Sequence, residues 1–179
     1  PLISAEHREK VAAYVDKARE QGAKILTGGR AATSEDTNGQ HGTGTTDLGA
    51  GVYYLPTIID GATREMDCVH DEAFGPTVTI ETFTTEEEAI AIANDTEYGL
   101  AGAVYTSDAG RAERVARALR HGTIWINDFH PYLPQAEWGG YKQSGNGREL
   151  GPTGLAEYQE HKHVYQNLSP AAWDQFGLQ

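Results

Sequence analysis

Two short segments hold residue types that suit chemistry better than scaffolding. The first is Asp71-Glu72-Ala73-Phe74-Gly75-Pro76, where an acid, an aromatic ring and a Gly-Pro bend lie between a predicted loop and a predicted strand. Side chains at such a position project from a sheet end toward a cleft. A carboxylate there can accept both hydroxyls of a ribose, and a phenyl ring can pack on a flat nicotinamide. The alternative is a turn with one solvated acid and one core phenylalanine.

The second segment, Trp138 to Gly151, holds five glycines in fourteen residues, together with Trp, Tyr, Lys, Arg and Glu. Glycine allows positive φ angles and close backbone approach, so we expect this backbone to adopt one specific irregular shape. Ordered irregular segments are where function tends to lie. The alternative is a flexible surface loop, but such loops rarely carry this many large side chains.

The single cysteine, Cys68, excludes an intrachain disulfide and a cysteine-based zinc cluster. No adjacent cation evidently lowers the pKa of its thiol, although His70 is two residues away. We therefore interpret Cys68 as a small buried or semi-buried residue rather than a nucleophile. His161 and His163 could share one face of a strand, but without a third ligand nearby we expect no metal site.

Composition narrows the possible partners and location. The chain has 179 residues, with 14 Lys and Arg against 26 Asp and Glu, a formal charge of −12. Such a surface repels phosphate backbones and anionic membranes, which argues against a nucleic-acid or membrane partner. No apolar run approaches the roughly 20 residues that span a bilayer, and no signal peptide is evident. The sequence therefore predicts a cytoplasmic globular protein.

The elements that position these segments alternate along the chain. Apolar spacing and caps predict three helices, five short strands and one solvated Gly/Thr-rich loop. Pro56 limits the second strand to an edge or an end of a sheet. The helices are expected over 4–21, 85–94 and 108–119, the strands over 23–26, 52–59, 77–83, 101–105 and 123–127, and the loop over 31–51. This order implies an α/β domain with a largely parallel sheet and flanking helices.

Taken together, the motifs resemble one family. Trp138 to Gly151 resembles the C-terminal signature of the aldehyde dehydrogenase superfamily. Glu72 to Pro76 is similar to its Glu-Ile-Phe-Gly-Pro motif, with Ala73 where isoleucine is usual. Residues 94–101 resemble the segment that normally follows, and residues 122–127 match the strand before the signature. These matches occur in family order and at family spacing across nearly the whole chain.

The resemblance implies roles for five residues. Glu72 would hold the nicotinamide ribose of NAD or NADP, and Phe74 would position the nicotinamide ring. Tyr132 and Trp138 fall where aromatic residues line the aldehyde tunnel. Glu149 falls where the family has a buried acid linked to proton release from the general base; equally, it could anchor the glycine-rich loop by hydrogen bonds.

The family reaction oxidises an aldehyde to its carboxylate through a cysteine thiohemiacetal and thioester. The nucleophilic cysteine, the glutamate base and the Rossmann-type domain have no counterpart in this sequence, which begins at Pro1 rather than Met. We therefore expect residues 1–160 to be the C-terminal portion of a catalytic domain that is inactive alone. Residues 161–179 would form an oligomerisation strand and tail in a homodimer or tetramer.

Residues 127–138 resemble the betaine aldehyde dehydrogenase branch, where tryptophan stands at the position of Trp138. A trimethylammonium group is attracted to an indole face by about 0.5–2 kcal/mol. Tyr132 and Trp138 could equally line a tunnel for a neutral aldehyde or an aminoaldehyde. Two further alternatives stay open: a non-catalytic partner subunit, and a small-molecule binding module that uses the Trp138 region.

Overall fold

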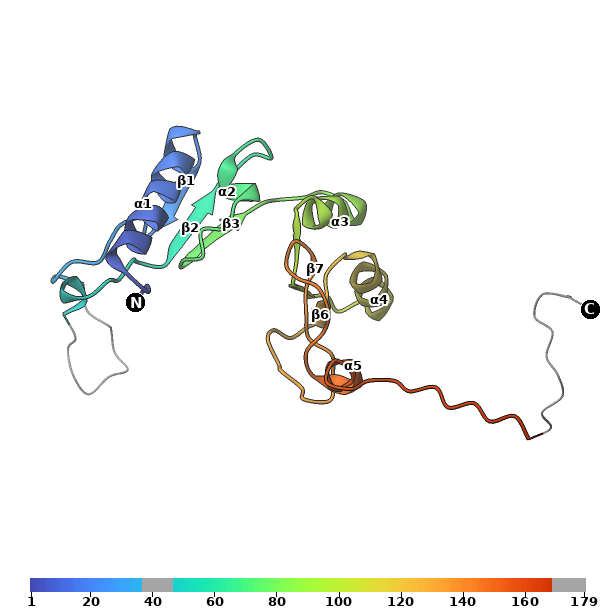
Figure 1. Cartoon of the computed structure of the whole chain (residues 1–179). Helices are drawn as coiled ribbons and strands as arrows, with labels where there is room; N and C mark the ends of the chain where they lie inside the picture. The colour runs from blue at the N-terminus through green and yellow to red at the C-terminus, as the bar shows by residue number, and fades with distance from the viewer. Residues whose placement is uncertain (37–46, 169–179) are drawn as a thin grey trace, which may run out of the picture. The chain divides into compact units, whose positions relative to one another are not determined.

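A computed structural model describes residues 1–36 and 47–168 (Figure 1). The chain divides into two compact units, Pro1–Glu97 and Tyr98–Gln179, here called unit 1 and unit 2. In the described part of the chain, no helix is both long and apolar enough to cross a membrane.

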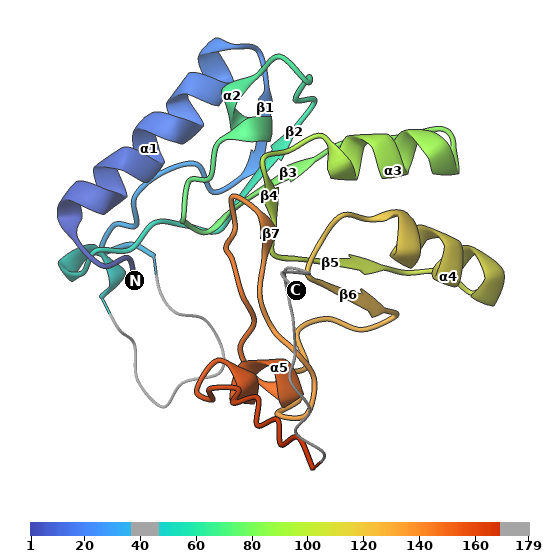
Figure 2. The same cartoon turned by 45° about the vertical axis from the view of Figure 1, so that its right-hand side comes forward.

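Unit 1 begins with helix α1 (Ala5–Glu20), which confirms the first predicted helix. The Ser4 hydroxyl caps it by accepting a hydrogen bond from the His7 amide at 3.1 Å. Its apolar stripe consists of Val11, Val15 and Ala18, which are buried, and Tyr14, which is partly buried. Helix α1 therefore packs one face inward, and Figures 1 and 2 both show it beside the sheet of unit 1.

That sheet has the order β1-β2-β3, with β1 (Lys24–Thr27) antiparallel to β2 (Thr57–Asp60) and β2 parallel to β3 (Thr77–Ile80). Strand β2 is shorter than the predicted 52–59 because Pro56 has no N–H to donate to a ladder. Ile59 is fully buried in the core cluster with Met66 and Cys68. The sheet and α1 thus enclose the core of unit 1.

Two further helices complete unit 1. The short α2 (Asp67–His70) immediately precedes the Glu72 turn. Helix α3 (Glu86–Asn94) is capped by the Thr85 hydroxyl, close to the predicted 85–94. Its apolar residues Ala89, Ile90 and Ala93 are only half-buried within the unit.

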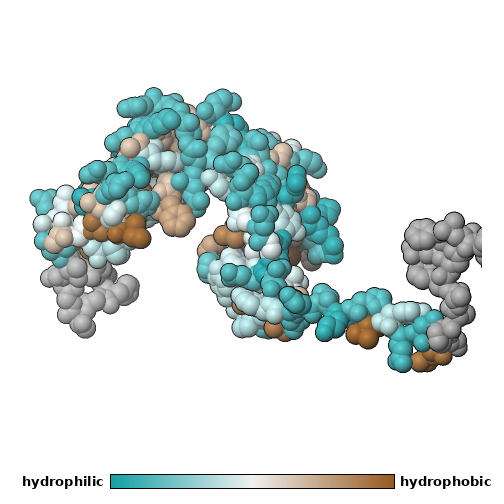
Figure 3. Space-filling view, in the orientation of Figure 1, coloured by the Kyte–Doolittle hydropathy of each residue, from teal (hydrophilic) through white to brown (hydrophobic). Residues whose placement is uncertain are grey.

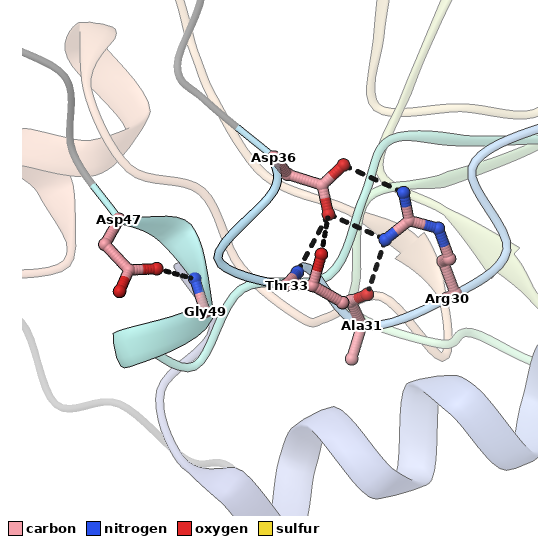
Figure 4. Close-up of polar contacts among 6 residues, drawn as sticks. All are labelled: Arg30, Ala31, Thr33, Asp36, Asp47 and Gly49. Atoms are coloured by element: carbon pink, nitrogen blue, oxygen red, sulfur yellow. Dashed lines mark hydrogen bonds and ion pairs between the residues drawn. The ribbon is translucent and has the colours of Figure 1, made fainter.

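The loop predicted over 31–51 is described only at its ends, since residues 37–46 lie outside the described residues. On the near side, the Arg30 guanidinium donates to the Asp36 carboxylate at 2.6 and 2.8 Å, and the Thr33 amide donates to it at 2.8 Å (Figure 4). The hydrogen bonds from Arg30 are the main reason that the pKa of Asp36 lies well below its usual value. On the far side, Asp47 caps the 3-10 turn η2 (Leu48–Ala50). Aspartate-centred turns therefore order both described ends.

The described part of unit 2 contains two strand pairs and two helices. Strand β5 (Ala101–Val104) runs parallel to β6 (Thr123–Ile126), and β4 (Tyr98–Gly99) runs antiparallel to β7 (Tyr141–Lys142), as Figure 2 shows. Helix α4 (Ala109–Ala118) is capped by Asp108 as predicted, and α5 (Gly151–Ala156) follows the glycine-rich segment. The predicted α/β fold with parallel strand pairs is confirmed, and two further pairs are antiparallel.

In the single chain, the oligomerisation tail that begins at His161 forms no strand, and its predicted pairing with a neighbouring subunit stays a prediction. Residues 161–167 have no regular secondary structure. Val164, Tyr165 and Leu168 are 79%, 79% and 82% exposed. A strand needs a partner for its backbone groups, and no strand in the described part of unit 2 pairs with this tail.

Candidate active site

In unit 1, the candidate functional region is the turn that carries Glu72 and Phe74. Both side chains point away from the unit's core: Glu72 is exposed, and Phe74 is 79% exposed. The alternative of a core phenylalanine is therefore wrong for this unit. The Glu72 carboxylate forms no hydrogen bond or ion pair with the described residues of unit 1. An acceptor and an aromatic ring are thus available two residues apart.

The backbone after Phe74 is fixed against the core. The Pro76 carbonyl accepts the Thr57 amide at 2.8 Å, at the start of the β2–β3 pairing. Gly75 lies so close to α1 that an added Cβ would be 2.7 Å from Val11 Cγ2. A side chain at position 75 would push the turn away from α1. The Gly-Pro bend therefore fixes the backbone that follows Phe74 against α1 and β2.

A largely apolar pocket of about 600 Å³ adjoins this turn. Its lining includes Leu48, Tyr53, Tyr54, Leu55, Pro56 and Phe74. Figure 3 shows apolar surface at this part of unit 1, near the N-terminal end of α1. The buried Tyr54 hydroxyl has no hydrogen-bond partner in the described residues. An exposed phenyl ring, an open apolar wall and an uncommitted carboxylate fit the nicotinamide and ribose of a dinucleotide.

Cys68 behaves as the sequence indicated. Its side chain is 4% exposed and packs in the core cluster with Ile59 and Met66. Burial raises the pKa of the Cys68 thiol, with smaller contributions from the charges of Asp67 and Glu81. Because only the thiolate is a good nucleophile, this residue suits packing rather than covalent chemistry.

In unit 2, the candidate functional region is an aromatic cluster. The two predicted substrate residues are neighbours, since the ring centroids of Tyr132 and Trp138 are 4.5 Å apart. Trp125 is buried within β6, and its ring lies 5.9 Å from that of Trp138. The ring pairs are tilted, at centroid distances typical of aromatic contacts. The cluster therefore joins the strand to the glycine-rich segment.

Sequence reasoning missed two members of this cluster, Phe129 and His130. The Phe129 ring packs edge-on against Trp125 at 5.5 Å, and the His130 ring lies 5.0 Å from Tyr132. Asn127 supports the start of this loop, because its side chain both accepts from the Thr106 amide and donates to the Thr106 carbonyl. The only available signal was the density of rings in residues 125–138.

The glycine-rich segment has the specific irregular shape that its composition indicated. Trp138 and Glu149 form an isolated antiparallel bridge, and the Ser144 hydroxyl accepts from the Gly99 amide at 3.0 Å. Arg148 donates to the Gly140 carbonyl at 3.2 Å and stacks over the Tyr141 ring at 5.1 Å. These contacts hold the beginning and the end of the segment against each other.

The Glu149 side chain differs from the family expectation of a buried acid, because it is exposed in unit 2. Its carboxylate forms no hydrogen bond or ion pair with the described residues of that unit. Its backbone does anchor the segment, through both hydrogen bonds with Trp138. A groove of about 860 Å³ runs beside it, lined by Trp138, Gly139, Arg148, Glu149, Leu155 and Tyr158.

Comparisons with known proteins place these features in a family context. Residues 1–164 match the sequence profile of the aldehyde dehydrogenase family. The chain is 56% identical over 176 residues to the betaine aldehyde dehydrogenase of Bacillus subtilis (strain 168), a match that covers 98% of this chain and 34% of that protein. It is 43% identical over 173 residues to the peroxisomal aminoaldehyde dehydrogenase 2 of Pisum sativum, covering 97% of this chain and 32% of that protein.

The solved structures include the betaine aldehyde dehydrogenase of Staphylococcus aureus in complex with NAD+. That structure matches with a TM-score of 0.87 and 50% identity, over 99% of this chain and 33% of the other. The chain thus spans about a third of the length of the relatives that it matches. From the profile match over residues 1–164 and the ordered motifs described above, the chain belongs to the aldehyde dehydrogenase family.

Proposed function

We propose that this chain supplies the nicotinamide-facing and aldehyde-facing surfaces of an NAD(P)-dependent aldehyde dehydrogenase, which oxidises an aldehyde to its carboxylate. The observation that carries the proposal is the aromatic cluster around Trp138, whose backbone is fixed by the bridge to Glu149. A rigid π surface beside a glycine-rich segment suits recognition of a small substrate. The reacting cysteine and the general base would come from the part of the relatives that this chain does not span.

Toward the cofactor, the proposal gives unit 1 a binding role. The Glu72 carboxylate would accept hydrogen bonds from the two ribose hydroxyls, and the exposed Phe74 ring would lie against the nicotinamide. The cofactor, when bound, accepts the hydride that leaves the substrate. The NAD+ complex of the Staphylococcus aureus relative supports NAD as a cofactor of this part of the family. NADP stays an alternative, because no residue that would contact the adenosine ribose is identified.

Toward the substrate, the proposal favours an aldehyde with a cationic group. Tyr132 and Trp138 present π faces that attract a quaternary ammonium by about 0.5–2 kcal/mol per ring. The formal charge of −12 also favours the approach of cations. The names of the betaine aldehyde and aminoaldehyde dehydrogenases among the relatives support this substrate class. An acetaldehyde dehydrogenase at 44% identity keeps a neutral aldehyde as the competing substrate.

For assembly, the proposal is a cytoplasmic homodimer or tetramer. The exposed Val164, Tyr165 and Leu168 would gain a strand partner and apolar cover from a neighbouring subunit. The tail that lacks regular structure in the single chain would then become ordered on association.

A chimera tests the proposal. In it, this chain replaces the matching third of the Bacillus subtilis relative, which the 56% identity makes structurally compatible. We expect the chimera to reduce NAD+ when betaine aldehyde is added, and the host protein that lacks this third to be inactive. A chimera that folds and assembles like its host, yet oxidises neither betaine aldehyde, an aminoaldehyde nor acetaldehyde, would contradict the proposed function.

A further inference from the structure

One face of α1 contacts the Glu72 turn at three points. His7, Val11 and Tyr14 are spaced four and three residues apart, so they lie on the same side of the helix. Val11 packs against Gly75, as described above. The other two residues make hydrogen bonds to the backbone of the turn, one on each side of Glu72.

Phe74 needs such support because its backbone is strained. Its φ angle is +49°, in the left-handed region that non-glycine residues rarely adopt. Bulky residues persist there only where their surroundings hold them. The same conformation leaves the Phe74 ring 79% exposed rather than packed in the core. Whatever holds this backbone therefore also fixes where the ring lies.

His7 makes the direct contact with this strained residue. Its Nε2 lies 2.9 Å from the Phe74 carbonyl oxygen. Because a carbonyl oxygen can only accept, Nε2 must carry the proton and donate. The backbone of His7 is fixed, since the residue is in the first turn of α1 and its amide donates to the Ser4 cap. The hydrogen bond thus connects a capped helix terminus to the carbonyl of the strained residue.

Tyr14 fixes the other side of the turn. Its hydroxyl points at two carbonyl oxygens, Cys68 at 2.8 Å and Asp71 at 3.2 Å. These carbonyls belong to α2 and to the residue just before Glu72. Glu72 and Phe74 are therefore carried on a short stretch that α1 holds at both ends.

We propose that His7 is a positioning residue, which holds Phe74 in its left-handed conformation and so keeps the phenyl ring turned out for the nicotinamide. The role of the ring rests on the proposed function, whereas the hold on the backbone does not. His7 would not touch the cofactor itself. It acts through the carbonyl of the residue that does.

Cofactor affinity of the chimera gives the first test. His7→Phe keeps the ring but removes the donor, and His7→Gln places an amide N–H at a similar reach. Glu9→Ala, at an exposed position of the same helix, is the matched control. We expect His7→Phe to weaken NAD+ binding about fivefold, a change of the size that one hydrogen bond supplies, and the other two variants to bind like the parent. Equal affinities for His7→Phe and the parent, or equal losses for His7→Phe and His7→Gln, would overturn the proposal.

A second readout separates this proposal from the proposed function. A positive φ brings the amide proton close to the Hα of the same residue, so Phe74 should give a strong intraresidue amide–Hα cross-peak in NMR spectra of the 179-residue chain. The cross-peak should persist in His7→Gln and weaken in His7→Phe. A chimera that fails to bind NAD+ while this pattern holds would reject the cofactor role alone. A cross-peak that is weak in the parent, or unchanged in His7→Phe, would reject the role of His7.

Discussion

Trp138 and Glu149 face each other across a closed pair of backbone hydrogen bonds. The Trp138 amide donates to the Glu149 carbonyl at 2.7 Å, and the Glu149 amide donates to the Trp138 carbonyl at 2.6 Å. The bridge leaves the Glu149 carboxylate exposed and uncommitted in unit 2, while the Trp138 ring joins the aromatic cluster. The backbone of Glu149 therefore positions the indole, and its side chain is available for another task.

The variant Glu149→Gln separates these two roles. Glutamine keeps both backbone hydrogen bonds, so we expect an unchanged melting temperature. If the carboxylate relays a proton, kcat of the chimera should fall on the order of tenfold or more, because the amide cannot take up a proton. Steady-state rates and thermal unfolding of the same preparations check this. An unchanged kcat would leave Glu149 with the backbone role alone.

Trp138 gives a prediction on substrate choice. Trp138→Ala removes the indole face, and we expect the KM of the chimera for betaine aldehyde to rise about tenfold, at the upper end of one cation–π contact. The KM for acetaldehyde should change much less, because a neutral aldehyde does not gain from the quadrupole of the ring. Trp138→Phe, with a weaker π face, should be intermediate. Equal changes for both aldehydes would reject a cationic substrate.

The sequence predicted the local elements of this chain well. Helices α1 and α4 begin after Ser4 and Asp108 as expected, because a cap and a repeated apolar spacing are local properties. The pairing of β4 with β7 was not predicted. Each of these strands has two residues, which is too short for an alternating pattern, and the pairing joins positions more than forty residues apart.

The candidate site residues were also predicted only in part, because contacts between distant residues leave no local pattern. Tyr132 and Trp138 were expected near one another, and their rings are indeed in contact. Phe129 and His130 also join the cluster, in a loop where Asn127 and His130 adopt positive φ angles of 54° and 72°. Glycine indicates such angles far more strongly than asparagine or histidine does. The tail forms no strand in the single chain, because a strand needs a partner that the local pattern does not reveal.

Gly122 is expected to be intolerant of any side chain. An added Cβ would lie 1.7 Å from the Gly139 carbonyl oxygen, so Gly122→Ala must displace the glycine-rich segment from the start of β6. We expect a loss of about 2 kcal/mol in the free energy of unfolding, the range of overpacked sites. The control is Gly110→Ala in the exposed first turn of α4, where alanine should be neutral or mildly stabilising. Chemical denaturation measures both, and similar values would contradict the close approach.

Cys68 is expected to be slow to react in the folded chain. It is the only cysteine, so a thiol reagent reports on it alone. Burial raises the pKa of its thiol, and modification in native buffer should therefore be at least about tenfold slower than in denaturant. In the chimera, Cys68→Ala should keep kcat within about twofold, since its role is packing. Rapid modification of the native chain, or a lost kcat in a well-folded variant, would show that the thiol is functional.

Ionisation of Tyr14 at alkaline pH is expected to lower the free energy of unfolding. Burial, and then the nearby charges of Cys68 and Asp71, raise the pKa of Tyr14 from 10.0 to about 12. Because the folded-state pKa exceeds the unfolded one, the stability contributed by the neutral phenol is fully present below pH 10 and is lost as the pH rises toward 12.

Ultraviolet titration should show one tyrosine that ionises near pH 12 in the parent and is missing in Tyr14→Phe. The free energy of unfolding should fall more steeply for the parent than for Tyr14→Phe between pH 10 and 12. Parallel curves would mean that the Tyr14 hydroxyl is not held by the Cys68 and Asp71 carbonyls.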